Sequence, residues 1–146
     1  QAGVLAGYPV DDVKIELLGA DYREESSTVQ SFKVAASIAL REALKKAEPI
    51  LLEPIMEINI ISPNEYLGEI ISDLNSRRGQ VESIEEDGDA RMIKGLIPLA
   101  ETFGYATNLR SISQGRASFT LQPKNYAPVP ENRAKLIMAK RYGLPT

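Results

Sequence analysis

The sequence contains no cysteine, no histidine and no tryptophan among its 146 residues. Without cysteine the chain has no disulfide and no thiolate nucleophile, a composition that suits a reducing compartment. Without histidine it lacks the commonest general base and the commonest ligand of transition metals. A glycine-rich phosphate loop of the Walker type is absent as well. These absences argue against an enzyme built on a nucleophile and a base.

Long apolar runs are also missing from the sequence. No stretch approaches the ~20 residues that span a bilayer, and no basic start leads into an apolar segment. We therefore expect no membrane partner and a cytoplasmic location. The opening QAGVLAGYP has no initiator methionine, which predicts a fragment or a processed product.

The carboxylates that are present sit in turn-like contexts. Glu24-Glu25 and Glu85-Glu86-Asp87 are paired along the sequence, but ordinary surface charge explains them better than a metal or catalytic site. We expect no catalytic, cofactor-binding or metal-ligating residue in this chain.

The charge is unevenly divided, although the net charge is only −3. Residues 1–76 are net acidic and residues 77–146 are net basic. Such an asymmetry can mark a surface that faces an anionic partner, but from charge alone two solvated faces explain it better.

Residues 1–52 provide only two periodic segments. Val13, Ile15 and Leu17 alternate with charged residues, a pattern that predicts a half-buried strand. Ser27 and Gln30 have the spacing of a capping box, and the helix after them runs to Pro49. The expected buried face of this helix holds Phe32, Ala36, Ala39, Leu40, Ala43 and Ala47. Two elements cannot enclose a core, so this part needs either the second module or a partner segment from outside this sequence.

Residues 53–126 show a longer order of elements. LLEPIMEINIISP predicts a strand, and Ser62, as a cap, begins a helix whose buried stripe includes Ile70 and Leu74. Gly79 is expected to be the left-handed residue after this helix. The segments GQVESIEE and ARMIKGLIP predict two strands joined at Asp87–Asp89.

The second helix of this part is predicted from near Pro98 to Gly115. Gly104 then lies in its interior, where glycine destabilises a helix by roughly 1 kcal/mol relative to alanine. Close approach of another backbone would explain why a glycine is present there. Its sheet-facing residues are expected to be Leu99, Phe103, Ala106 and Leu109, and RASFTLQP forms the last strand. Residues 127–146 form a tail with a short helix from about Glu131.

The resulting order is strand, helix, strand, strand, helix, strand. This is the ferredoxin-like split βαβ order, an α+β fold with both helices on one face of an antiparallel sheet. Domains that read RNA on such a sheet stack bases on aromatic residues of the open face. The positions expected there carry no aromatic side chain: Glu57, Asn59, Lys94, Ser118, Thr120 and Gln122. A module that docks by helices, loops and edges onto a large partner fits better.

Four blocks of the sequence closely resemble the C-terminal part of elongation factor G, the translational GTPase that drives translocation on the ribosome. They are AGVLAGYPVDDVKIELLGADY, FKVAASIALREALKKAEPILLEPIMEI, YLGEIISDLNSRRGQVE and LIPLAETFGYATNLRSISQGRASFTL, and the resemblance runs from about Ala2 to Pro130. Elongation factor two and the tetracycline-resistance ribosomal protection proteins share this architecture. LLEPIM and FGYATNLRSISQGRASF favour the factor-G branch, in which the principal factor, a ribosome-recycling paralogue and a mitochondrial form stay open as alternatives.

The resemblance implies a division of the chain. Residues 1–52 would be the end of domain four, which has an S5-like fold, residues 53–126 the ferredoxin-like domain five, and residues 127–146 the tail. The GTPase domain, with its GTP and Mg²⁺, has no counterpart here, so the chain is expected to be non-catalytic by itself. As a piece of the factor it would interact with the missing N-terminal domains, exchange segments or self-associate.

The resemblance also implies a partner and a contact surface. Domain five of the family lies against the GTPase-associated region and the sarcin-ricin loop of large-subunit rRNA, beside ribosomal protein L11. The candidate contact residues are Arg77, Arg78, Tyr105, Asn108, Arg110, Ser111, Gln114 and Arg116. For the six candidates from Tyr105 onward, the alternative interpretation is a solvated helix end. For Arg77 and Arg78, the alternative is that their charges match the negative end of the helix dipole. The alternative function is a stand-alone interaction or regulatory module with no role on the ribosome.

Overall fold

The computed structural model describes residues 3–143 and divides into two units. Unit 2 is Leu52–Pro128, and unit 1 combines the chain up to Leu51 with the chain from Val129 onward.

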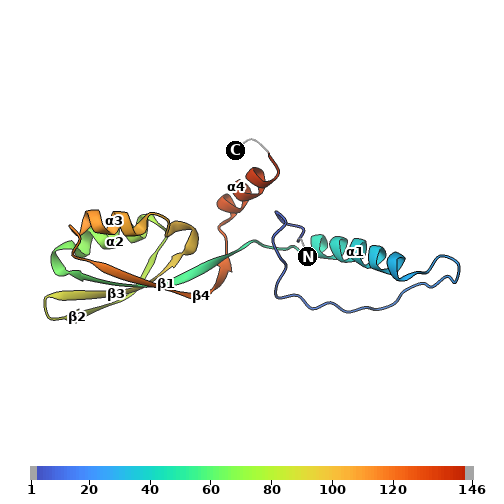
Figure 1. The fold of residues 1–146 in the computed structure, drawn as a ribbon, viewed down its shortest axis with the longest axis horizontal. Coiled ribbons are helices and arrows are strands. Elements are labelled where there is room, and N and C mark those ends of the chain that lie inside the picture. Colours follow the sequence, from blue (N-terminus) through green and yellow to red (C-terminus); the bar gives the residue numbers. More distant parts are fainter. Residues whose placement is uncertain (1–2, 144–146) are drawn as a thin grey trace. The chain divides into compact units, whose positions relative to one another are not determined.

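Unit 2 is a four-stranded antiparallel sheet with two helices. The strands are β1 (Leu52–Pro63), β2 (Gln80–Asp87), β3 (Ala90–Pro98) and β4 (Ser118–Pro128), in the spatial order β2-β3-β1-β4. The helices α2 (Leu67–Ser76) and α3 (Tyr105–Ile112) cover the same face of the sheet (Figure 1). The α+β, ferredoxin-like prediction is confirmed.

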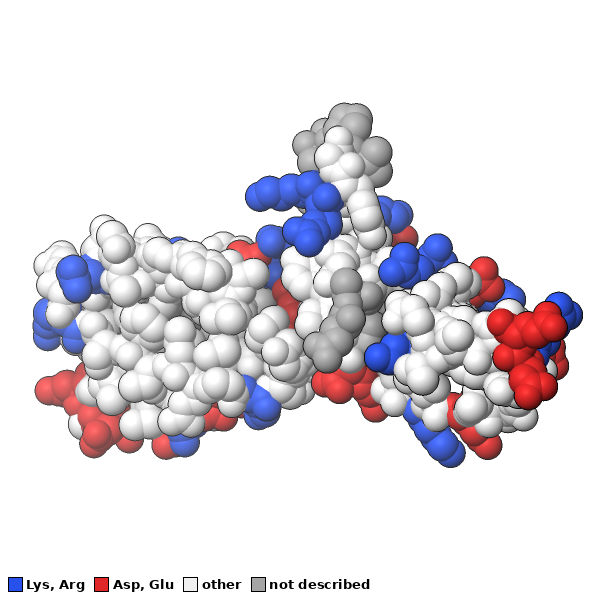
Figure 2. All heavy atoms as spheres, turned by 45° about the vertical axis from the view of Figure 1, so that its right-hand side comes forward, with Lys and Arg blue, Asp and Glu red and all other residues white. Residues whose placement is uncertain are grey.

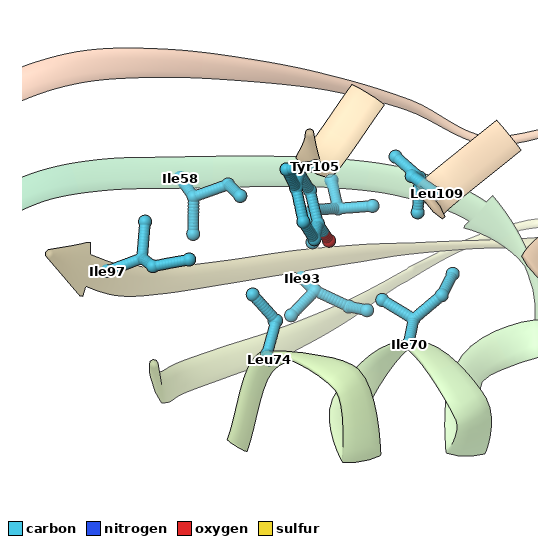
Figure 3. Close-up of a cluster of buried hydrophobic side chains, with 8 residues drawn as sticks. Ile58, Ile70, Leu74, Ile93, Ile97, Tyr105 and Leu109 are labelled. Atoms are coloured by element: carbon cyan, nitrogen blue, oxygen red, sulfur yellow. The ribbon is translucent and has the colours of Figure 1, made fainter. Parts of the chain in front are cut away.

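The core of unit 2 lies between this sheet face and the two helices. Ile58, Ile60, Ile93 and Ile97 project from the two central strands, as period-2 alternation requires. They meet Ile70 and Leu74 of α2 and Tyr105 and Leu109 of α3, and all eight side chains are at most 2% exposed (Figure 3). Phe119 and Leu121 of β4 pack against this cluster. The predicted buried stripe of α2, which includes Ile70 and Leu74, is confirmed.

The start of α3 differs from the prediction. Pro98 leads into a single 3-10 turn, η2 (Leu99–Glu101), and α3 begins only at Tyr105. Gly104 is the residue just before α3 and has a left-handed backbone, with φ of 73°. This conformation is easy for glycine and unfavourable for a residue with a Cβ. The glycine therefore separates two helical segments, and the predicted interior position is wrong.

The two ends of α2 also differ from the prediction. Ser62 is buried, and its hydroxyl donates to the Pro63 carbonyl instead of capping the helix. A 3-10 turn, η1 (Asn64–Tyr66), precedes α2, and neither segment has a side-chain cap. At the other end Arg78, and not Gly79, has the left-handed backbone, with φ of 58°. Gly79 is needed for another reason, because a Cβ there would lie 2.8 Å from the Leu74 carbonyl oxygen. Its N–H donates to that oxygen and closes the helix.

Unit 1 contains α1 (Val29–Lys46) and α4 (Glu131–Arg141). The capping box of α1 is formed by Thr28 and Ser31, one residue later than predicted. Helix α4 begins at Glu131 as predicted, and the Ala6 N–H donates to the hydroxyl of Tyr142 beyond its end. No helix within residues 3–143 is long and apolar enough to cross a bilayer.

Two predictions for unit 1 are wrong. Residues 13–17 form no strand, because a strand needs a neighbour for its N–H and C=O groups and the described chain supplies none. The apolar face of α1 is not buried either: α1 contains no buried residue, and Phe32 is 40% exposed. Its ring stacks on Tyr22, at 6.4 Å between centroids.

Candidate functional site

The eight predicted contact residues fall into three groups in the structure: one buried residue, three side chains tied to neighbouring elements, and four exposed side chains where α3 ends.

Tyr105 is the buried member and cannot contact a partner. Its side chain is 0% exposed and meets Phe119 edge to face, with ring centroids 5.0 Å apart. Burial raises the pKa of its hydroxyl, and the charge of Asp73 raises that pKa further. Among the described residues the hydroxyl has no hydrogen-bond partner. The prediction of Tyr105 as a contact residue is wrong, because the helix begins at this position and turns its ring into the core.

Asn108 ties α3 to α2. Its side-chain amide donates to Asp73 Oδ1 at 2.6 Å, and Arg77 Nε donates to the other oxygen of the same carboxylate at 3.1 Å. Arg77 also donates to the Glu101 carbonyl at 2.9 Å and lies over the Tyr105 ring, 5.2 Å from its centroid. One carboxylate thus holds both helices and the turn before α3 in a fixed arrangement. We call Asp73, Arg77 and Asn108 the interhelix clamp.

Arg78 is paired within unit 2. Its two terminal nitrogens donate to both carboxylate oxygens of Glu53 at 2.8 and 3.0 Å, and its Nε donates to Glu101 at 3.2 Å. The hydrogen bond to Glu53 raises the pKa of the guanidinium. Bidentate pairing fixes a guanidinium strongly. Arg77 and Arg78 are therefore held by ion pairs within unit 2, a role beyond a simple match to the helix dipole, and their contact with rRNA stays a prediction.

The four exposed candidates surround the end of α3. Helix α3 stops at Ile112, three residues before Gly115, and both Gln114 and Gly115 have left-handed backbones. The Gly115 N–H donates to the Arg110 carbonyl at 2.8 Å, which closes the helix in a Schellman-type turn. We define the α3 exit as Arg110, Ser111, Gln114, Gly115 and Arg116, all of which are exposed.

Ser113 anchors the α3 exit from below. It is 0% exposed, and its hydroxyl donates to the Leu109 carbonyl at 2.7 Å and accepts from the Ala117 N–H at 3.1 Å. This single side chain connects the last turn of α3 to the start of β4. Two backbone N–H groups of the exit are already used internally, since Gly115 donates to the Arg110 carbonyl and Arg116 donates to the Ser113 carbonyl.

An open hollow of about 310 Å³ adjoins the exit, between α3 and β4. Its walls are mostly small and apolar, with one cation at the rim: Ala106, Leu109, Arg110, Gly115, Ala117, Ser118 and Phe119. Among the described residues Arg110 forms no ion pair. On the face of unit 2 seen in Figure 2, the charged side chains of both signs lie along the edge, around a largely uncharged middle.

Arg116 has a different environment from Arg110. Its guanidinium forms an ion pair with Glu65 of η1 and lies over the Tyr66 ring, 5.8 Å from the centroid. Tyr66, and then the charge of Glu65, raise the pKa of Arg116. Both partners of the ion pair are 57% exposed, so water reaches the pair.

Sequence reasoning missed four residues of the site: Glu65, Tyr66, Asp73 and Ser113. Only the spacing of Asp73 and Arg77, one helical turn apart, carried a usable signal. The other contacts join residues far apart in the sequence. No cluster of three acidic side chains able to hold a metal occurs in the described part of the chain.

Comparison with known proteins gives matches along the whole chain. The family model for the elongation factor G C-terminus matches residues 50–137, and that for elongation factor G, domain IV, matches residues 1–48. "Elongation factor G 2" of Syntrophomonas wolfei is 58% identical over 99% of this chain. Elongation factor G of Fervidobacterium nodosum is 51% identical over 94% of it.

A crystal structure of a protein from Thermus thermophilus superposes with a TM-score of 0.87 at 35% identity, covering 99% of this chain and 22% of that one. The chain spans 21% and 20% of the two curated relatives.

The fold and the site define an α+β protein whose ferredoxin-like unit presents a rigid, polar helix end. With these matches, the chain belongs to the elongation factor G family and corresponds to the C-terminal part of that translation factor.

Proposed function

We propose that this chain docks an elongation factor G-type translocase on the large ribosomal subunit through the α3 exit. The contact is with rRNA backbone in the GTPase-associated region and the sarcin-ricin loop, beside ribosomal protein L11, in the cytoplasm. Family membership and the matched C-terminus model support the ribosome as the partner.

The observation that carries the proposal is the exposure of the exit on a fixed frame. Arg110, Ser111 and Gln114 point to solvent, while the interhelix clamp and Ser113 hold the backbone beneath them. Preorganised side chains lose little conformational entropy on binding. Arginine and small polar side chains are the usual donors to phosphate and sugar oxygens.

The charge of Arg110 matters at this place. The carboxyl end of a helix carries a partial negative charge, which repels an approaching phosphate. Arg110 lies in the last turn of α3 and offsets that charge. Contact with RNA at the exit therefore depends on this cation.

We propose no catalysis by this chain. GTP and Mg²⁺ would be bound by a GTPase domain elsewhere in the intact factor, and the matched family models describe only domain IV and the C-terminus. Isothermal calorimetry with the purified chain should give no saturable heat of GTP binding.

The test compares two single charge removals. Arg110→Ala should weaken binding to purified large subunits and lower the slope of log affinity against log salt by about 0.7–1, because one phosphate contact is lost. Lys33→Ala removes an exposed charge on α1 and should leave both values unchanged. The proposal would be contradicted if Arg110→Ala bound with the same affinity as the wild-type chain while its circular dichroism spectrum showed an unchanged fold.

A further inference from the structure

The two arginines of the α3 exit differ in one respect. Arg110 is unpaired within residues 3–143, whereas Arg116 is held by Glu65 and Tyr66, which lie 51 and 50 residues earlier in the chain. A helix end that binds RNA gains nothing from a carboxylate on one of its two cations. The role of Glu65 at this position therefore needs an explanation.

Glu65 is well placed to hold Arg116 without burying it. It lies in η1, a turn fixed between β1 and α2 by Ser62 in the core and by the hydrogen bond from the Asn64 N–H to the Asp89 carbonyl. The ion pair is solvent-exposed on both sides. Exposed pairs are weak, so an anion that approaches Arg116 can replace the carboxylate.

Tyr66 orients the Arg116 guanidinium for the exchange of the Glu65 carboxylate for a phosphate. The Arg116 guanidinium carbon lies over the Tyr66 ring, 5.8 Å from its centroid, in addition to its ion pair with Glu65. A guanidinium on an aromatic face keeps its planar donors directed outward, toward a second ligand. The Glu65 carboxylate is thus the group that a phosphate oxygen would have to displace from Arg116.

We infer that Glu65 and Tyr66 form a latch on Arg116, which an RNA backbone phosphate opens by displacing the Glu65 carboxylate. The inference rests on the proposed function and adds a regulatory element to the same surface. In the latched state Arg116 contributes no net charge to the exit. A phosphate recruits the charge of Arg116 by replacing Glu65, at the cost of a weak, solvent-exposed ion pair.

The latch predicts that Glu65→Gln strengthens binding. The amide keeps the size of the side chain and removes its charge, so Arg116 is free for phosphate. We expect an increase of about two- to fivefold in affinity for large subunits at ~0.1 M salt, with a steeper salt slope. The control is Glu69→Gln, which removes an equal, exposed charge one helical turn away with no contact to Arg116. It should change affinity by less than about twofold.

A variant that combines the Glu65 and Arg116 substitutions shows whether Glu65→Gln acts through Arg116. Arg116→Ala should weaken binding more in the Glu65→Gln chain than in the wild-type chain, and Glu65→Gln should have no effect once Arg116 is alanine. Equal strengthening by Glu65→Gln and Glu69→Gln would contradict the latch, since bulk charge then explains the gain. Strengthening that persists with Arg116→Ala would contradict it as well.

A second readout separates the latch from ribosome docking. Tripolyphosphate is titrated against the isotopically labelled full chain, and the Arg116 Nε–H signal is followed by NMR. We expect a larger shift at lower concentration for Glu65→Gln than for the wild-type or Glu69→Gln chain. If large subunits fail to bind any variant, the proposed function fails, but this titration still decides the latch. Identical titrations of the three chains would overturn it.

Discussion

Tyr105 places a hydroxyl group in an apolar core without a partner among the described residues. A buried hydroxyl that makes no hydrogen bond destabilises the fold by about 1–3 kcal/mol. We therefore expect Tyr105→Phe to unfold in urea with a free energy of unfolding that is unchanged or up to ~2 kcal/mol higher. Tyr126→Phe, at a ring that is 65% exposed, is the control and should be within about 0.5 kcal/mol of wild type. A loss of more than ~1 kcal/mol in Tyr105→Phe would show that the hydroxyl has a partner, such as a buried water.

The same residue predicts a dependence of stability on pH. The ordinary tyrosine pKa is 10.0, and burial raises the pKa of Tyr105 above it. Above pH ~10 the unfolded chain loses this proton while the folded chain keeps it. The free energy of unfolding should then fall as pH rises, by up to about 1.4 kcal/mol per pH unit from this group. Urea unfolding at about pH 9 and about pH 11, on either side of the ordinary pKa, checks this, and the fall should be smaller in Tyr105→Phe. An equal fall in both chains would assign it to other groups.

Single residues were the hardest to predict from the sequence. Arg77 and Arg78 look like free cations because their acceptors, the Glu101 carbonyl and Glu53, are 24 and 25 residues away. Tyr105 looks like a polar surface residue because its place depends on the exact residue at which α3 begins. Arg110 and Ser111 are exposed, as residues that contact a partner must be. Their contact with RNA stays a prediction.

At the scale of elements, Gly104 gives a direct test of where α3 begins. With a left-handed backbone, Gly104→Ala should destabilise unit 2 by about 1–2 kcal/mol, although nothing lies within 4 Å of the added Cβ. Gly68→Ala has the same open surroundings inside α2 and should stabilise by about 0.5–1 kcal/mol. Thermal unfolding of the two variants shows whether each substitution stabilises or destabilises unit 2. Stabilisation by Gly104→Ala would place the glycine in a continuous helix instead.

Strands and helices of unit 2 could be predicted because each carries its own pattern. Met56, Ile58 and Ile60 alternate in β1, and Ile70 and Leu74 repeat along α2. Val13, Ile15 and Leu17 alternate as clearly, yet they form no strand. Alternation reports which face of a strand is apolar, but it does not supply the neighbouring strand. The glycines gave the helix ends only approximately: α3 ends three residues before Gly115, and Arg78 rather than Gly79 is the left-handed residue after α2.

At the scale of the whole molecule, the two units should differ in resistance to protease. Unit 2 has a core of eight buried residues, whereas neither α1 nor α4 contains a buried residue. We expect trypsin to cut first after Lys14 or Arg23, in exposed chain without regular structure. Arg77 and Arg91 in unit 2 should resist. Mass spectrometry of a time course identifies the sites, and early cleavage at Arg91 would contradict this division of stability.

The central claim is that the α3 exit touches large-subunit rRNA, and a site-specific crosslink tests it most directly. A photoreactive amino acid at position 111 should crosslink the chain to large-subunit rRNA, because Ser111 is exposed in the exit. The same group at position 120, on the open sheet face, is the control and should give no rRNA crosslink. Crosslinking from position 111 alone is the result that the account predicts. Crosslinking from position 120 and not from 111 would contradict it.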